Sequence, residues 1–237
     1  MGCENILENN IFAVILAAGK SSRMKGTDKI LEKLINNKEV IINTIYKFDA
    51  IESISKIILV TRDDIIDKIK DIIKKYNFKK NIYVIEGGKT RTESLFLGYE
   101  FIKNKFGFNK NDFCLIHDGA RPLIRQSDIL TCLDLAFKNK AAAVGVKIND
   151  TIKKADENSI ITQTVDRSNL FYIQTPQIFE NSILDLAIKN AKEKNLDFTD
   201  DCQLIESIGQ KVYISSGDFS NIKITTQEDL FLVNKLI

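Results

Sequence analysis

Basic side chains that follow an apolar run are the first feature of this chain whose spacing suggests chemistry. In ILAAGKSSRMKGTDK (15–29), small residues let a ligand approach the backbone, whose free N–H groups bind phosphate oxygens. The small residues are Ala17, Ala18 and Gly19, and the cations on the same loop are Arg23 and Lys29. Because a triphosphate carries several negative charges, the segment predicts a nucleotide phosphate site.

The spacing of residues argues against three other well-known kinds of site: a Walker A loop, a dinucleotide-binding loop and a Ser-His-Asp triad. Gly19-Lys20-Ser21 resembles the end of a Walker A loop, but the upstream glycine would have to stand at Val14. No GxGxxG occurs, which argues against a nicotinamide-dependent oxidoreductase. A Ser-His-Asp triad would need His117, the only histidine, yet no GxSxG elbow accompanies it. A hydrogen-bonded structural role for His117 is favoured.

The segment GGKTRTES (87–94) follows another apolar run. Paired glycines, Gly88 among them, allow a flat base to lie against the backbone, and Ser94 is placed to read a base edge by hydrogen bonding. Thr90 with Glu93 three residues later predicts a capping box at the start of a helix.

Further polar residues stand at the ends of later segments. Asp118 ends a buried run in LIHDGARP (115–122), where an unpaired carboxylate is costly unless it meets a metal or a cation. Arg121 can reach the same place. Taken alone, solvated surface charge is the favoured interpretation of the remaining four, which are Asp150, Thr151, Arg167 and Lys223.

These residues need a scaffold that brings strand ends together. Short apolar runs typical of buried parallel strands occur at 11–18, 56–61, 81–86, 112–118 and 141–147. Helical patterns lie between them, at 39–50, 63–76, 90–105 and 127–138. The alternation predicts an α/β fold with a mostly parallel sheet and helices on both faces. Ligands of such sheets bind beyond the carboxyl ends of the strands.

The alternation of strands and helices is interrupted at 148–175. Here two stretches of alternating apolar and polar residues flank a polar turn at Asp156–Ser159. A projecting β-hairpin fits this segment. Helices near 180–194 and 199–208, a strand at 211–216 and a helix from 226 complete the chain. We expect one domain over residues 1–237 that carries the hairpin as an arm.

The amino-acid composition argues against several classes of protein. The chain of 237 residues has 34 basic and 32 acidic residues, and this balance argues against a nucleic-acid-binding protein. The four cysteines form no CxxC pair, which indicates reduced core thiols in a cytoplasmic protein. No apolar run approaches the length of a membrane span.

Taken together and in order, the segments resemble the 2-C-methyl-D-erythritol 4-phosphate cytidylyltransferase family. The residues that match its pattern are LAAG (16–19), Arg23, Lys29, GGKTRTES (87–94), HDGARP (117–122), Asp150–Thr151, TVDR (164–167), TPQ (175–177), TDD (199–201) and NIKIT (221–225). The resemblance extends over nearly the whole chain from about residue 11.

The resemblance implies a Rossmann-like nucleotidyltransferase fold that forms a homodimer through the arm. It implies transfer of CMP from CTP to a sugar-alcohol phosphate, 2-C-methyl-D-erythritol 4-phosphate, with Mg²⁺ or another divalent cation at Asp118. The catalytic residues would be Arg23, Lys29, Arg167 and Lys223. CTP would contact Ala17, Ala18, Gly19, Gly88 and Ser94, and the substrate would face Asp118, Arg121 and Thr151, partly across the dimer interface.

The chain departs from the family at two places. Asp28–Lys29–Ile30 replaces the usual Pro-Lys-Gln, so Lys25 is the alternative second cation, and Lys89 stands where an acidic residue is usual. Two other functions stay open. A ribitol-5-phosphate cytidylyltransferase is disfavoured because that group more often has AGG where this chain has Ala17-Ala18-Gly19. The other is a catalytically inactive nucleotide-binding module.

Overall fold

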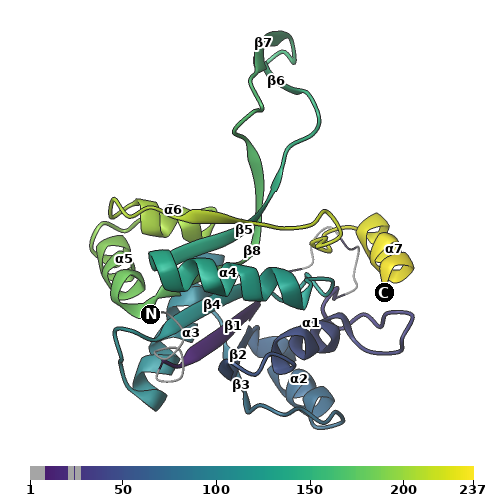
Figure 1. Cartoon of the computed structure of the whole chain (residues 1–237). Coiled ribbons are helices and arrows are strands. Elements are labelled where there is room, and N and C mark those ends of the chain that lie inside the picture. The colour runs from purple at the N-terminus through teal and green to yellow at the C-terminus, as the bar shows by residue number, and fades with distance from the viewer. Residues whose placement is uncertain (1–8, 21–23, 25–27) are drawn as a thin grey trace.

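The computed structural model describes residues 9–20, 24 and 28–237 (Figure 1). The predictions for Arg23 and Lys25 lie outside the described residues. A seven-stranded sheet runs in the order β3-β2-β1-β4-β8-β5-β9. The strands are β1 (Ile11–Ala17), β2 (Ile54–Thr61), β3 (Ile82–Glu86), β4 (Phe113–Asp118), β5 (Ala141–Lys147), β8 (Phe171–Glu180) and β9 (Tyr213–Ser216).

The helices connect the strands and cover both faces of the sheet. They are α1 (Val40–Asp49), α2 (Ile66–Ile73, after a 3₁₀ turn at Asp63–Ile65), α3 (Arg91–Phe106), α4 (Gln126–Asn139), α5 (Asn181–Glu193), α6 (Asp201–Glu206) and α7 (Gln227–Leu236). None of these described helices is both long and apolar enough to cross a membrane.

β1 shows why the apolar runs become central strands. Successive side chains of a strand point to opposite faces, so Ala13 and Ile15 join one buried cluster while Phe12 and Val14 join the other. Both faces are covered by helices, and a continuous apolar run is the sequence that this arrangement requires. The predicted α/β fold with a mostly parallel sheet is confirmed: the β1–β2, β1–β4, β2–β3 and β5–β9 pairs are all parallel.

The predicted hairpin is present as an antiparallel pair, β6 (Ile152–Ala155) and β7 (Ile161–Val165), which projects from the body of the molecule (Figure 1). The prediction was wrong about its end at residue 175. Residues from Phe171 onward belong to β8, which lies between β4 and β5 and is antiparallel to both.

Pro176 explains why β8 is hidden in the sequence. Proline lacks an N–H group and argues against a central strand. Here the pairing of β5 with β8 is irregular between Ala143 and Gly145, opposite the stretch between Gln177 and Ile173 that contains Pro176. The irregularity accommodates the missing donor, and the strand continues.

Candidate active site

The first predicted loop and the Asp118 segment leave neighbouring strands at the same edge of the sheet. Leu16 pairs with Asp118 across β1 and β4, and Ala17 pairs with Thr61 across β1 and β2. All three strands are parallel, so their carboxyl ends meet at one edge, where ligands of such sheets bind.

Asp118 lies at the centre of a cluster of cations. Its Oδ2 is 2.9 Å from Lys223 Nζ and 3.4 Å from Arg121 Nε, and its Oδ1 is 3.4 Å from Arg91 Nε. Burial alone would raise the pKa of this carboxyl, but the charges of Lys223, Arg91 and Arg121 outweigh burial and hold the pKa well below its usual range. Asp118 is therefore a permanent anion that gathers three cations.

Arg91 connects Asp118 to a second buried carboxylate. Its Nη1 and Nη2 donate to Asp201 Oδ1 at 2.5 Å and Oδ2 at 2.7 Å. Burial raises the pKa of Asp201 although Arg91 acts in the opposite direction. Since Arg91 begins α3 and Asp201 begins α6, the first turns of two helices are joined beside the site.

His117 is fully buried, and both ring nitrogens are engaged. Nε2 donates to the carbonyl of Arg121 at 3.2 Å, which leaves Nδ1 to accept from the hydroxyl of Thr175 at 3.0 Å. The same hydroxyl accepts from the N–H of Asp118 at 3.0 Å. Burial lowers the pKa of His117 to about 4. The predicted structural role is confirmed, because this neutral ring holds the Asp118 and Arg121 segment in place.

Lys223 reaches the site on a segment that is itself fixed at both ends. Asn221 donates to the Thr175 carbonyl at 3.0 Å, and the N–H of Ile224 donates to the Ala120 carbonyl at 2.9 Å. Ile224 packs in a buried cluster with Val233 of α7. The backbone on either side of Lys223 is thus held against the Asp118 segment.

A small polar hollow of about 110 Å³ opens at this cluster. Its lining is Arg91, Asp118, Arg121, Ile173, Gln174, Thr175, Gln177, Thr199, Asp200 and Lys223. Three predicted residues from two separate segments therefore converge: Asp118 and Arg121 from one, and Lys223 from the other. The hollow suits a small anion with hydroxyl groups, because cations and hydrogen-bonding side chains surround it.

The two glycine-containing loops that are predicted to bind the nucleotide touch one another. A Cβ on Gly87 would lie 2.7 Å from Ala18 Cβ and 2.9 Å from Ser94 Oγ, so a glycine is needed for this approach. The Ser94 hydroxyl donates to the Thr90 carbonyl at 2.9 Å and accepts from Gly88 N at 3.1 Å. It holds the Gly87–Gly88 turn against the helix in this structure. A base contact by Ser94 stays a prediction.

The predicted capping box at the start of α3 is confirmed. The N–H of Glu93 donates to the Thr90 hydroxyl at 3.0 Å, and the Glu93 carboxylate accepts from the N–H of Thr90 at 3.3 Å and of Lys89 at 2.6 Å. The capping box sets the direction of α3, and Arg91 in its first turn thereby faces Asp118.

Arg167 and Thr151 are not part of the hollow within this chain. Both belong to the arm, where Arg167 follows β7 and its Nη1 donates to the Asn149 carbonyl, and Thr151 directly precedes β6. The arm extends away from the sheet (Figure 1). A single copy of the chain therefore does not bring Arg167 and Lys223 together.

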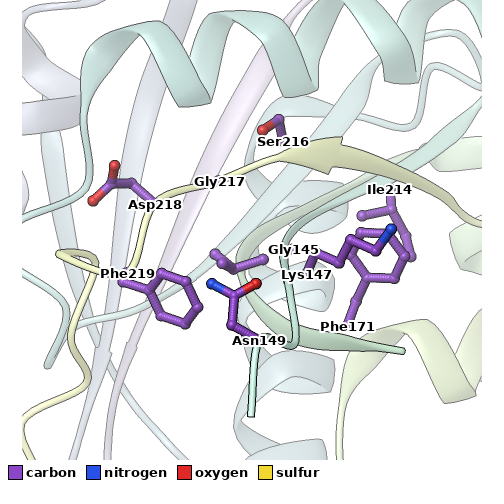
Figure 2. A pocket seen from close by; sticks show the side chains of 10 residues that line it. Gly145, Lys147, Asn149, Phe171, Ile214, Ser216, Gly217, Asp218 and Phe219 are labelled. Atoms are coloured by element: carbon purple, nitrogen blue, oxygen red, sulfur yellow. The ribbon is translucent and has the colours of Figure 1, made fainter. Parts of the chain in front are cut away.

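A larger hollow of about 450 Å³ lies at the base of the arm. Figure 2 shows its lining from β5, β8, β9 and the segment after β9, with the rings of Phe171 and Phe219 on either side of Asn149 in this view. Lys147 and Asp218 add charged groups at its edge. The hollow is separate from the Asp118 cluster, since the two linings share no residue.

The described residues do not fit a metal site with several protein ligands. Asp118, the predicted ligand, already faces Lys223, Arg91 and Arg121. Within residues 9–20, 24 and 28–237, no three His, Cys, Asp or Glu side chains are grouped so that they would hold a metal ion. The prediction that Asp118 binds Mg²⁺ stays a prediction.

Two residues of the cluster escaped the sequence reasoning. Arg91 stands inside GGKTRTES and Asp201 inside TDD, yet neither was assigned a role. Their charge could have indicated a role, because each stands at the first position of a helix and belongs to a segment that matches the family pattern.

The chain is similar to known proteins over nearly its whole length. The sequence profile of the 2-C-methyl-D-erythritol 4-phosphate cytidylyltransferase family matches residues 11–237. The chain belongs to this family. A cytidylyltransferase of that name from Caldanaerobacter subterraneus subsp. tengcongensis is 40% identical over 222 residues, which cover 93% of this chain and 96% of the relative.

Solved structures agree with the family assignment. The 4-diphosphocytidyl-2C-methyl-D-erythritol synthase of Anaerococcus prevotii has a TM-score of 0.82 and 33% identity, over 98% of this chain and 97% of that one. The 2-C-methyl-D-erythritol 4-phosphate cytidylyltransferase of Francisella tularensis has a TM-score of 0.81 and 27% identity, over 97% and 100%. The predicted cytidylyltransferase family and Rossmann-like nucleotidyltransferase fold are confirmed.

Proposed function

We propose that the chain transfers the cytidylyl group of CTP to 2-C-methyl-D-erythritol 4-phosphate and releases pyrophosphate. The convergence of Lys223, Arg121 and Arg91 on Asp118 is the observation that carries the proposal. It supplies a cationic site for the sugar phosphate next to the loop predicted to bind the triphosphate. The family match over residues 11–237 supports this choice of substrates.

The reaction needs charge stabilisation more than proton transfer. The attacking oxygen belongs to a phosphate that is already anionic, so no general base is required. Two anions must approach, and charge builds on the α-phosphate, which positioned cations stabilise. The only histidine has a pKa lowered to about 4 by burial and is unsuited to act as a base at neutral pH. In this proposal Lys223 and Arg121 hold the sugar phosphate, while Arg23 and Lys29 stabilise the α-phosphate.

The nucleotide lies across the touching loops of β1 and β3 in this proposal. Ala17, Ala18 and Gly19 present backbone N–H groups to the phosphates, and the Gly87–Gly88 turn accepts the base. A Cβ on Gly19 would meet no atom of the described residues within 4 Å, which supports space for a ligand at that point. A divalent cation, when bound, supplies further positive charge to the phosphates, and phosphate oxygens rather than several carboxylates would hold it.

The enzyme acts as a homodimer in this proposal, with Arg167 and Thr151 supplied to the site of the partner. Support comes from the arm and its base, where apolar side chains are exposed: Ile160, Ile161, Phe171, Tyr172, Ile173, Ile214 and Phe219. Contiguous exposed apolar surface is typical of a protein interface. Free, buried thiols at Cys114, Cys132 and Cys202 support a cytoplasmic location.

The decisive experiment measures pyrophosphate release from CTP with a panel of polyol phosphates. We expect turnover with 2-C-methyl-D-erythritol 4-phosphate and little with ribitol 5-phosphate. Preferential turnover of ribitol 5-phosphate would overturn the substrate assignment. CTP binding without pyrophosphate release for any polyol phosphate would instead identify a catalytically inactive nucleotide-binding module.

A further inference from the structure

Arg62 directly follows β2, and its guanidinium contacts both ends of the segment that joins Gly19 to Asp28. Nη1 donates to the Gly19 carbonyl at 3.1 Å, and Nη2 forms an ion pair with the Asp28 carboxylate. β1 and β2 are paired in parallel up to Ala17 and Thr61, so Arg62 starts beside the first loop. One side chain thus connects the beginning and the end of this segment.

The guanidinium also contacts an exposed carboxylate, that of Asp64. Arg62 Nε donates to Asp64 Oδ1 at 2.9 Å. The Arg62 and Asp28 side chains are only 15% and 18% exposed, whereas Asp64 is 62% exposed. Ion pairs with little exposure are less screened by water than surface pairs. Water therefore screens the Arg62–Asp28 pair less than the Arg62–Asp64 pair, and Asp64 has no contact with the segment that carries Lys29 among those described.

The pKa of Arg62 agrees with this picture. Burial alone would lower it, yet the hydrogen bonds and charges of Asp64 and Asp28 raise the pKa above its ordinary value. The guanidinium is charged at every working pH, and the contact persists.

Asp28 in turn fixes the backbone around Lys29. The Asp28 carbonyl accepts from the N–H groups of Leu31 at 2.9 Å and Glu32 at 3.2 Å, which closes a turn over Lys29. On the other side, Ile30 is buried in the core, and its carbonyl accepts from Ile41 N of α1 at 3.0 Å. Lys29 stands between a carboxylate held by Arg62 and a residue held by the core.

We propose that Arg62 is a positioning residue for the transfer reaction, because it holds Asp28 against the end of β1 and so sets the place of Lys29 at the phosphates. The inference rests on the proposed function, in which Lys29 stabilises the α-phosphate. A lysine side chain is long and flexible, so the placement of its backbone decides whether the ammonium group meets the transition state. Catalytic rates are sensitive to misplacement of about 1 Å.

Arg62 is not needed to hold the fold together in this interpretation. Both β2 and α1 contribute residues such as Ile57, Leu59 and Ile41 to a large buried cluster. The Arg62 contacts lie at the edge of the sheet, outside that cluster. Loss of the guanidinium should therefore disturb the loop and leave the core intact.

The test uses Arg62→Ala, Asp28→Ala and the double variant, with Asp64→Ala as the matched control. In the CTP and 2-C-methyl-D-erythritol 4-phosphate assay, we expect both single variants to lower kcat by roughly 10- to 100-fold with little change in KM, which is the pattern of a lost transition-state contact. The double variant should be no slower than the slower single variant, because both remove one contact. Asp64→Ala should stay near the wild-type rate.

A second readout does not depend on the reaction. Amide hydrogen exchange at Leu31 and Glu32 should be faster in Arg62→Ala and Asp28→Ala than in the wild type and Asp64→Ala, at unchanged thermal stability. Unchanged exchange in both variants, additive losses in the double variant, or an equal loss in Asp64→Ala would overturn the role of Arg62. A wild-type protein that releases no pyrophosphate would overturn the proposed function instead, while the exchange rates would still decide whether Arg62 holds the turn.

Discussion

Arg91 and Asp201 form a buried two-point ion pair that joins the first turn of α3 to the first turn of α6. The guanidinium of Arg91 also faces Asp118 through Nε at 3.4 Å. One arginine therefore connects a helix on the outer part of the fold to the carboxylate at the end of β4. This relationship links the stability of the fold to the geometry of the candidate site.

Asp201→Ala should destabilise the protein strongly. The change leaves the Arg91 guanidinium, which is 27% exposed, without its closest counter-ion, and removal of one partner of a buried pair costs about 3–5 kcal/mol. Urea unfolding of the variant measures the loss. Asp71→Ala is the control, because its pair with Lys74 is exposed and should contribute less than about 0.5 kcal/mol. Equal effects of the two variants would contradict the interpretation.

Mild acid should destabilise the fold through His117. Burial lowers its pKa to about 4, so between pH 6.5 and 4 the unfolded chain binds a proton that the folded chain does not. The contribution is fully present above pH 6.5 and is lost as the pH falls, by about 2 kcal/mol between pH 7 and pH 5. Denaturant unfolding at both pH values checks this.

The variant His117→Gln isolates that effect. It removes the only histidine of the chain and keeps a donor and an acceptor. Whatever its stability at pH 7, the variant should lose little between pH 7 and pH 5. A pH dependence equal to that of the wild type would show that other groups are responsible.

Two glycine substitutions should separate nucleotide binding from packing. Gly87→Ala places a Cβ 2.7 Å from Ala18 Cβ and should cost about 1–3 kcal/mol of stability. In Gly19→Ala the new Cβ meets no atom of the described residues within 4 Å, so stability should not change, while affinity for CTP should fall about tenfold if the backbone there faces the phosphates. Calorimetric titration with CTP measures the affinity. Undiminished affinity in Gly19→Ala would remove Gly19 from the nucleotide site.

Two inactive variants should restore activity when mixed. Each of Arg167→Ala and Lys223→Ala should lower the rate by about 10²–10³-fold, by analogy with a lost oxyanion donor. If Arg167 serves the partner's site, a mixed dimer contains one intact site and one doubly defective site. Equal amounts of the variants, unfolded and refolded together, should then recover about a quarter of the wild-type activity. No recovery beyond the sum of the two variants would place both residues in one subunit or remove Arg167 from the site.

Strand–helix alternation could be predicted from the sequence because a strand that is buried on both faces requires a continuous run of apolar residues. The run 11–18 is apolar throughout, and the structure places its side chains alternately in two clusters. The capping box of Thr90 and Glu93 could also be predicted, since it depends on contacts between residues that are close in the chain. β8 could not be predicted from the sequence, because Pro176 and the exposed Phe171–Ile173 stretch resemble neither a buried strand nor an alternating one.

The candidate site divides along the same line. The sequence by itself determined which chemical groups the chain offers: small residues and cations suited to binding phosphates, in an order that matches one family. Only the tertiary structure decided that Lys223 meets Asp118 across 105 residues of chain, that Arg91 and Asp201 close the cluster, and that Arg167 stands apart on the arm. Local sequence encodes which groups are available, but ion pairs between distant segments depend on strand order and helix direction, which the packing of the whole chain sets.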